Sequence, residues 1–425
     1  MGMTDMRNKH WLNNCLPMVL EPLPGIWADS EDQNLLRKSV LSLLTLLVRA
    51  CGGGGSVGPG LTTQSTHAML KPLVMPMLEV ATDTRLADND YLIEDGLELW
   101  KVTVLEAPDY SMDLDALFPN LCRLLSRDLE FLQQGMAILD AYVVIGGRTF
   151  LTNHAGPVSE MLFLVVGDVS ARGAPFVSDA LESLLRSFSA EGSEMLLQSG
   201  VLTKLLQPCL AATTESGTRR VGGEVVTLHL TTLARVLLTS PNHFAALLTS
   251  CSNGNPDQVP LMVMALVGLW LEYFDEVGHS GVSGTWRRKL WACTLVSVIP
   301  FNGGLLLGRL DEILNVCTDL LSDRDSITSF TIHSNEATAD DNAAAAAAAT
   351  TTGVGDAYTH RLRQILMSDP VHQIDLRSYI DEKMSECARV IGQVKFEEAL
   401  SSVEPVIIKQ LQQIQPSHAN STPTS

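Results

Sequence analysis

The chain has 425 residues, of which 46% are hydrophobic, and its formal net charge is −19. This hydrophobic content excludes a wholly disordered chain, and the acidic balance argues against direct nucleic-acid binding, which rewards lysine and arginine. Basic protein partners fit better, and the length allows two or three ordinary domains or one elongated repeat array.

Residues 1–32 are expected to be irregular because prolines and a glycine interrupt any periodic pattern. From residue 33 to residue 322, apolar residues recur at helical spacing, as they do at Leu132, Met136 and Leu139. The expected helices cover about 33–50, 66–81, 90–105, 113–126, 128–145, 154–167, 176–189, 193–211, 222–239, 241–250, 257–275, 285–299 and 304–322. No alternation of strands and helices can be drawn, so the sequence predicts an all-α protein.

The helical pattern fails between residues 323 and 356, where acidic and polar residues surround seven alanines at 343–349. This composition offers little apolar area to a core and predicts a disordered low-complexity loop. Helices resume over residues 357–415 and are expected to cap the array, with Pro405 either kinking the last helix or starting a separate one. The tail, residues 416–425, is expected to be disordered.

Many helices joined by short connections, in pairs of roughly 40 to 47 residues, are typical of HEAT and armadillo repeats. Most of these helices keep a polar face, which favours two stacked layers over a globular bundle with fully apolar central helices. The sequence therefore predicts an α-solenoid, a right-handed superhelix of antiparallel helix pairs, over residues 33–322.

Eight scattered cysteines without a CxxC pair indicate a reducing compartment, with buried or half-buried thiols in place of a zinc module or disulfide framework. The longest uninterrupted apolar run, residues 261–271, is about half of the roughly 20 residues that span a bilayer, so we interpret it as a core helix. His229 lies beside an apolar stripe and is expected to be a core or interfacial histidine.

Catalytic chemistry finds little support. Gly54, Ser56 and Gly58 match the G-x-S-x-G pattern of a hydrolase nucleophile elbow, but a leucine-rich helix precedes them where that elbow needs a strand. The surrounding GGGGSVGPG has the composition of a flexible linker. We therefore expect no enzyme activity, no catalytic residues, no cofactor and no metal site, with a serine hydrolase at Ser56 as the remote alternative.

One amphipathic helix, expected at residues 90–104 with cap candidates at 88–90, presents acidic side chains opposite its apolar stripe. Glu94, Asp95 and Glu98 lie on this polar face and are candidate contacts for a basic partner. The alternative interpretation is a solvated face that is acidic for solubility.

Charge is unevenly distributed. Residues 81–130 contain twelve acids and four bases, and such an excess would attract a basic ligand. The one basic cluster, Arg287, Arg288 and Lys289, is expected to open a helix, where cations oppose the helix dipole. These side chains should either pair with acids of the preceding repeat, which we favour, or meet an acidic partner.

Four segments carry a resemblance to a known family: LIEDGLELWKVTV (92–104), ARVLLTSPNHFAALL (234–248), RRKLWACTLVSVIP (287–300) and SDPVHQIDLRSYIDEKM (368–384). In order and spacing they resemble the C-terminal part of nuclear transport receptors of the importin-β (karyopherin) superfamily, over roughly residues 35–412. None of them is a catalytic motif. They are packing and linker signatures of particular HEAT repeats.

The resemblance implies a receptor that binds protein cargo in the cytoplasm and crosses the nuclear pore through weak contacts with phenylalanine–glycine repeats of nucleoporins. It also implies that cargo is released in the nucleus when the small GTPase Ran binds. The superfamily's main Ran-binding region lies in its first few repeats, which nothing here resembles, so the chain looks like the C-terminal two-fifths of such a receptor. A HEAT-repeat scaffold without a transport cycle is the alternative function.

Overall fold

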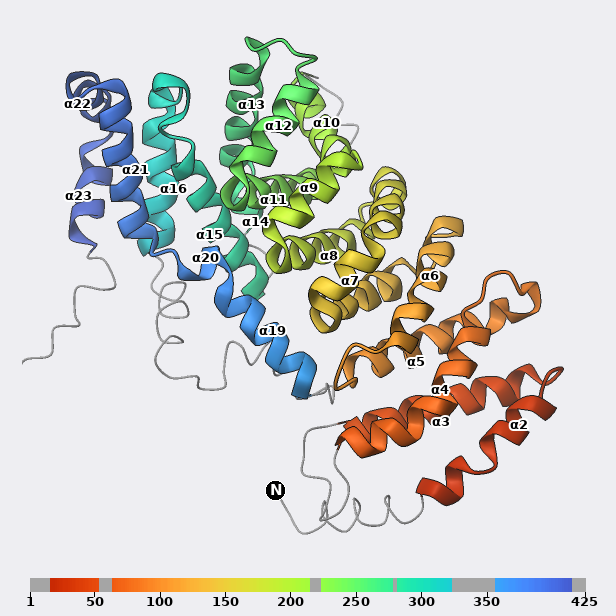
Figure 1. Ribbon diagram of the computed structural model, residues 1–425. Helices are drawn as coiled ribbons and strands as arrows, with labels where there is room; N and C mark the ends of the chain where they lie inside the picture. Colours follow the sequence, from red (N-terminus) through yellow and green to blue (C-terminus); the bar gives the residue numbers. More distant parts are fainter. Residues whose placement is uncertain (1–15, 53–62, 215–222, 278–280, 323–355, 415–425) are drawn as a thin grey trace, which may run out of the picture. The chain divides into compact units, whose positions relative to one another are not determined.

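The computed structural model describes residues 16–52, 63–214, 223–277, 281–322 and 356–414, and every regular element within these ranges is a helix (Figure 1). The prediction of an all-α protein is confirmed. The helices form two compact units. Unit 1 comprises residues 1–169 and 342–365, and unit 2 comprises residues 170–341 and 366–425.

Unit 1 is a stack of paired helices in two layers. Its elements are α2 (Leu23–Asp29), α3 (Asn34–Gly52), α4 (Thr63–Ala81), the 3₁₀ helix η1 (Ala87–Leu92), α5 (Ile93–Leu105), α6 (Met112–Arg127), α7 (Leu132–Asp168) and residues 356–365 of α19 (Asp356–Ser368). In one layer α5 lies between α3 and α7, while in the other α4 packs on α6, which also contacts α7. Helices α3 to α7 therefore bury their apolar stripes on neighbours within and between the layers.

The core of unit 1 is organised around aromatic side chains. Trp100 and Tyr142 are fully buried, and the Trp100 indole N–H donates to the Tyr142 hydroxyl at 2.9 Å. The Tyr142 hydroxyl in turn donates to the Leu114 carbonyl oxygen at 2.8 Å. Phe118 and Phe150 pack edge-to-face with their ring centroids 4.7 Å apart. These contacts join α5, α6 and α7 with no buried polar group of the Trp–Tyr pair left unpaired.

Helix α7 covers both of the helices expected at 128–145 and 154–167. The break between them is a single residue, Gly147, whose φ of 52° and ψ of −140° are not helical. A positive φ is far easier for glycine than for any residue with a Cβ atom. The loop expected between the two helices is therefore a kink at this glycine.

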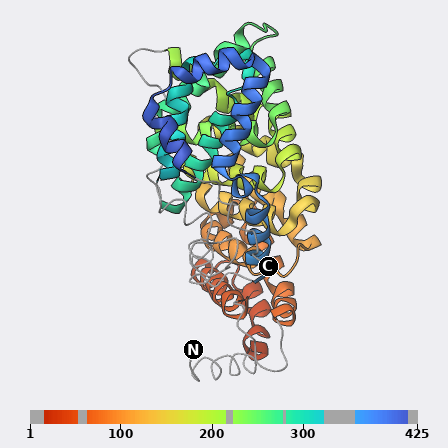
Figure 2. The ribbon, with the colours of Figure 1, turned by 90° about the vertical axis from the view of Figure 1, so that its left-hand side faces the viewer.

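Unit 2 is a second two-layer stack. Its elements are α8 (Ala174–Ser187), α9 (Ser189–Gln198), α10 (Val201–Thr214), α11 (Gly223–Thr239), α12 (Pro241–Cys251), α13 (Gln258–Glu272), α14 (Phe274–Val277), α15 (Gly281–Ser297), η2 (Phe301–Gly303), η3 (Leu307–Arg309), α16 (Leu310–Ser322), α20 (Pro370–Gln373), α21 (Leu376–Ile391), α22 (Gln393–Ser401) and α23 (Pro405–Gln413). Helices α8, α11, α15 and α21 pack side by side in chain order in one layer, and α10, α13 and α16 follow one another in the other. The C-terminal helices α21 and α23 lie against α16 (Figures 1 and 2). Both units thus have the paired helices of a HEAT or armadillo type solenoid, and that prediction is confirmed.

Helix α11 differs from the amphipathic helices expected, because every residue from 225 to 236 is buried. Its threonines are accommodated by bonding back along the helix, as when the Thr231 hydroxyl donates to the Thr227 carbonyl oxygen at 2.9 Å. Two tryptophans also donate to α11: Trp270 to the Leu230 carbonyl oxygen and Trp291 to the Thr231 hydroxyl, both at 3.1 Å. A buried helix with polar residues is stable here because its polar groups are largely paired.

The expectation of an irregular segment at residues 1–32 is wrong for its described part. Residues 16–20 are helical, and α2 follows with Pro22 at its N-cap and Pro24 in its first turn. Proline has no N–H to donate, but the first turn of a helix needs none, so these prolines start a helix. Pro405 behaves in the same way as the first residue of α23, which resolves that alternative in favour of a separate helix.

Several expectations fall on residues outside the described ranges. These are the N-terminal residues 1–15, the glycine-rich segment with Ser56, the low-complexity loop up to residue 355, and the tail.

Candidate partner-binding surface

The three predicted partner-binding residues lie on α5, which packs beside α3. Gly96 permits close packing here, since a Cβ atom added to it would lie 3.1 Å from the Cβ atom of Ala81 at the end of α4. Glu94 and Asp95 occupy the first turn of α5, where negative charge is favourable to the helix dipole. The predicted cap is wrong: residues 87–92 form η1, and Leu92 occupies the N-cap without a side-chain bond.

Two of these three acids are engaged within the chain. Asp95 lies 3.7 Å from the Lys38 ammonium, and Glu98 forms ion pairs with Arg49 and, at 3.5 Å, with Lys101. Glu94 is exposed and forms no ion pair with the described residues. A basic partner would therefore meet one open carboxylate and two that already have exchangeable partners.

Other acids of the segment 81–130 are also paired with cations of the chain. Most of its compensating cations come from other helices: Lys71 pairs with Asp113 at 2.5 Å, and Arg361 of α19 pairs with Asp109 at 3.1 Å. Counting charges in a sequence window could not reveal cations that the fold brings from outside the window. The excess of eight acids therefore overstates the open negative charge of this surface.

Asp115 shows a different, more structural use of a carboxylate. It accepts hydrogen bonds from the Tyr110 hydroxyl at 2.5 Å and from the Asn153 amide at 2.9 Å, and its oxygen lies 2.9 Å from the His154 ring. Burial alone would raise the pKa of Asp115, but these hydrogen bonds outweigh it and the pKa is lowered. This acid holds α6 against α7, and one of its carboxylate oxygens is already engaged by three side chains.

The basic cluster belongs to unit 2 and faces inward. Helix α15 begins at Gly281, so these residues do not open it as expected. Arg287 pairs with Asp179 at 2.7 Å and with Glu182 at 3.1 Å, so the predicted pairing with acids holds for this residue, but the acids lie on α8 and not on the preceding helix of the layer, α11. Arg288 lies over the ring of Phe274, and the buried Lys289 ammonium donates to the His372 carbonyl oxygen at 3.4 Å.

A buried ion-pair network next to this cluster was missed by the sequence reasoning. Asp369, which directly precedes α20, lies 3.0 Å from Arg235 of α11 and 3.0 Å from Arg186 of α8. Asp369 also accepts from the Val371 backbone N–H at 2.9 Å and so caps α20. The Asp369–Pro370 dipeptide is a recognisable helix-start signal, but nothing in the sequence identifies the arginines that lie against it.

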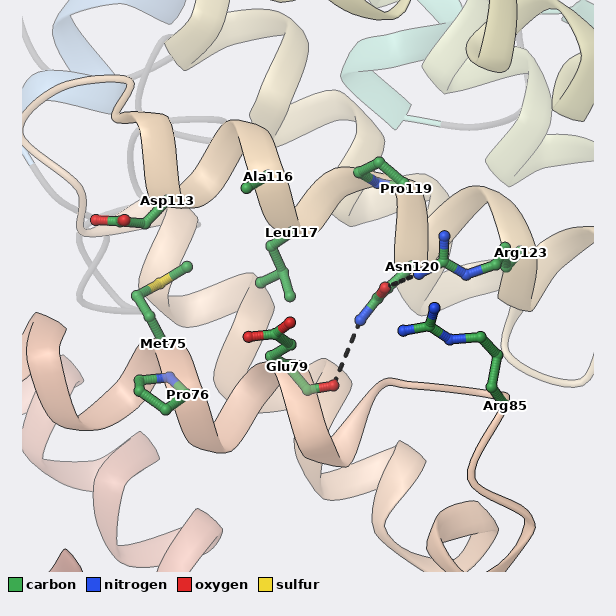
Figure 3. A pocket seen from close by; sticks show the side chains of 10 residues that line it. All are labelled: Met75, Pro76, Glu79, Arg85, Asp113, Ala116, Leu117, Pro119, Asn120 and Arg123. Carbon is green, nitrogen blue, oxygen red and sulfur yellow. Dashed lines mark hydrogen bonds between the residues drawn. The ribbon is translucent and has the colours of Figure 1, made fainter.

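Unit 1 also has an open groove between α4 and α6, termed here the α4–α6 groove, with a volume of about 440 Å³ (Figure 3). Its walls are Met75, Pro76 and Glu79 of α4 and Asp113, Ala116, Leu117, Pro119, Asn120 and Arg123 of α6, with Arg85 from the segment after α4. The Asn120 side-chain amide ties the two helices together by donating to the Thr82 hydroxyl at 3.0 Å and to the Glu79 carbonyl oxygen at 3.5 Å. Residues from 75 to 123 meet in this groove, and no sequence pattern joins them.

The described residues offer little to a metal or a nucleophile. Among them, no group of three or more histidine, cysteine, aspartate or glutamate side chains could hold a metal ion. Seven cysteines are unbridged and buried or half-buried, as predicted, and burial raises the pKa of the Cys209 and Cys293 thiols to about 12. Within the described part, no helix combines the length and the apolar content needed to cross a bilayer.

Comparison with known proteins agrees with the helical stacking. The family model described as "Importin-11-like, TPR repeats" matches residues 61–415. Importin-11 of Mus musculus is 23% identical over 406 residues, and Importin-11 of Homo sapiens is 23% identical over 410 residues; each alignment covers 93% of this chain and 38% of the relative. Importin beta-like protein kap113 of Schizosaccharomyces pombe is 22% identical over 395 residues, covering 92% of this chain and 36% of the relative. The chain thus spans less than two-fifths of the length of these relatives, and the resemblance inferred from the four segments is confirmed.

Proposed function

Because the chain belongs to the importin-11-like family, we propose that it forms the C-terminal part of a nuclear transport receptor that carries protein cargo between cytoplasm and nucleus. The observation that carries this proposal is the family match over residues 61–415, which includes helices of both units. Stacked helix pairs present many side chains on extended surfaces, and such surfaces suit protein partners. The proposed role is binding without catalysis.

We assign three partner classes to this role: protein cargo, phenylalanine–glycine repeats of nucleoporins, and the small GTPase Ran. The formal charge of −19 supports a preference for basic cargo, since the acidic chain raises the encounter rate with cations. A transport receptor must also enter both the cytoplasm and the nucleus.

For basic cargo, the proposed contact is the polar face of α5. Glu94 would bind first, because its carboxylate is exposed, while Asp95 and Glu98 would exchange Lys38 and Arg49 for cationic side chains of the cargo. Such an exchange costs little because surface ion pairs contribute only about 0–1 kcal/mol. Replacing all three acids by their amides should weaken binding of a basic cargo and reduce its salt dependence, and unchanged binding would exclude this face.

Ran separates the transport receptor from the alternative, a scaffold without a transport cycle. Partners captured from a cell extract on the immobilised chain should be released by Ran loaded with a non-hydrolysable GTP analogue and retained with Ran–GDP. The GDP form is the matched control, since it differs only in the nucleotide state. Because the family's main Ran-binding region lies in repeats that nothing in this chain resembles, binding of Ran–GTP to the chain itself is measured first. Equal retention with both forms although Ran–GTP binds would favour the scaffold.

A further inference from the structure

The α4–α6 groove combines an apolar wall with charge that is separated between its two ends. Met75, Pro76 and Leu117 supply apolar surface, while the guanidinium groups of Arg85 and Arg123 gather at one end (Figure 3). Asp113 lies at the opposite end, where it is paired with Lys71. An apolar groove with one cationic end favours a ligand that carries an apolar group next to an anion.

Arg123 is the open cation of this groove. Its guanidinium donates to the neutral side-chain oxygen of Asn120 and forms no ion pair with the described residues. Arg85 is held by the carboxylate of Asp83, with distances of 2.8 Å from its Nε and 2.7 Å from its Nη2. Two guanidinium groups thus stand at the same end of the groove. Asp83 acts electrostatically on both of them and Glu79 on Arg85. Arg123, by contrast, has no ion-pair partner among the described residues and can donate to a further carboxylate.

The remaining wall restricts what can bind. Glu79 projects into the middle of the groove from α4 and is exposed (Figure 3). The negative charge of Glu79 disfavours a ligand that is acidic along its whole length. Its carboxylate can accept hydrogen bonds from the backbone N–H groups of an extended peptide. The volume of about 440 Å³ accommodates a few side chains and is far smaller than a folded domain requires.

We propose that the α4–α6 groove binds a short linear segment of a partner protein in which an acidic side chain stands beside an apolar one. The carboxylate meets Arg123 and Arg85, and the apolar side chain lies against Met75, Pro76 and Leu117. This preference is opposite to that of the α5 face and requires neither basic cargo nor Ran. The groove can therefore bind its ligand even if the proposed transport role is wrong.

The test is the fluorescence anisotropy of a short labelled peptide, in which one aspartate stands beside a leucine and a phenylalanine, titrated with the full chain. Arg123→Gln should weaken binding about tenfold, because it removes a charge-assisted hydrogen bond. Glu79→Gln should strengthen binding about two- to threefold, because it removes a nearby like charge. Both side chains are exposed, so neither change disturbs the core.

The matched control is Arg127→Gln, one turn further along α6. Arg127 pairs with Asp90 at 3.0 Å and does not line the groove, so this change removes the same charge without touching the proposed site. Equal affinities of Arg123→Gln and Arg127→Gln would overturn the proposal, as would equal binding of a peptide with asparagine in place of the aspartate. Binding of a neutral phenylalanine–glycine peptide in this groove with the same affinity as the acidic peptide would also overturn it.

Discussion

In unit 1 the carboxylates of Asp95 and Glu98 form ion pairs with Lys38 and Arg49 on the surface, and each of the four side chains is 28% to 42% exposed. In unit 2, by contrast, Arg235 and Asp369 form an ion pair in which both side chains are 0% exposed. The chemical groups are the same, but water screens the first set and is excluded from the second. The exposed pairs can therefore be exchanged at little cost, whereas removal of one partner of the buried pair would leave an uncompensated charge in the core.

The largest expected effect is in the buried network. Asp369→Ala leaves Arg235 buried without its counter-ion, which should destabilise unit 2 by about 3–5 kcal/mol. The midpoint of urea unfolding measures this loss. Asp381→Ala is the control, because Asp381 is 55% exposed and pairs with Arg377 on the surface of α21. If both variants unfold at the same urea concentration, the contrast between buried and exposed pairs fails.

A second effect concerns His229, a buried titratable group of unit 2. Burial lowers its pKa from 6.5 to about 4, and its Nδ1 atom has no hydrogen-bond partner among the described residues. As the pH falls from about 6.5 to about 4, this histidine binds a proton in the unfolded chain but not in the folded chain. The free energy of unfolding therefore decreases over this range, in total by on the order of 3 kcal/mol.

The pH dependence of the free energy of unfolding, compared between the unaltered chain and His229→Gln, measures this effect. Glutamine keeps a side-chain donor near the Leu205 backbone, with which the histidine is hydrogen-bonded. Unlike histidine, glutamine does not titrate. The variant should lose less stability between pH 7 and pH 5. Parallel profiles for the two proteins would show that His229 is not the group responsible.

A smaller effect is expected from the neutral hydrogen bonds in the core of unit 1. Tyr142→Phe removes the hydroxyl that joins the Trp100 indole to the Leu114 carbonyl, which leaves the buried indole N–H unpaired. This should destabilise unit 1 by roughly 1–3 kcal/mol, as judged by thermal unfolding. Trp100→Phe in the same chain should recover part of the loss. Full additivity of the two changes would contradict a shared hydrogen bond.

The smallest effect is expected at the surface. The double change Asp95→Asn and Glu98→Gln should alter stability by less than about 1 kcal/mol, and the difference should shrink as salt is added. Thermal unfolding at low and high ionic strength measures it. A loss comparable to that of Asp369→Ala would show that these acids are structural and not open to partners.

The helices themselves were predictable because apolar residues that step by four and three positions, as at Leu132, Met136 and Leu139, come together on one face of a helix. The partners in long-range ion pairs could not be predicted from the sequence, because they are residues far apart in the chain. Asp369 lies 134 positions from Arg235, and Arg361, which pairs with Asp109 in unit 1, lies 252 positions from it. Pro22 and Pro24 were expected to break a helix, but a proline at the N-cap or in the first turn starts one, and the sequence alone did not show where the turn begins. The α4–α6 groove likewise exists only once α6 packs on α4.

The most direct test of the transport role is the affinity of the purified chain for nucleoporin phenylalanine–glycine repeats, measured beside repeats whose phenylalanines are replaced by serine. A transport receptor should bind the natural repeats weakly but saturably and should lose that binding with the serine repeats. Absence of binding to the natural repeats, or equal binding to both, would contradict the proposed role.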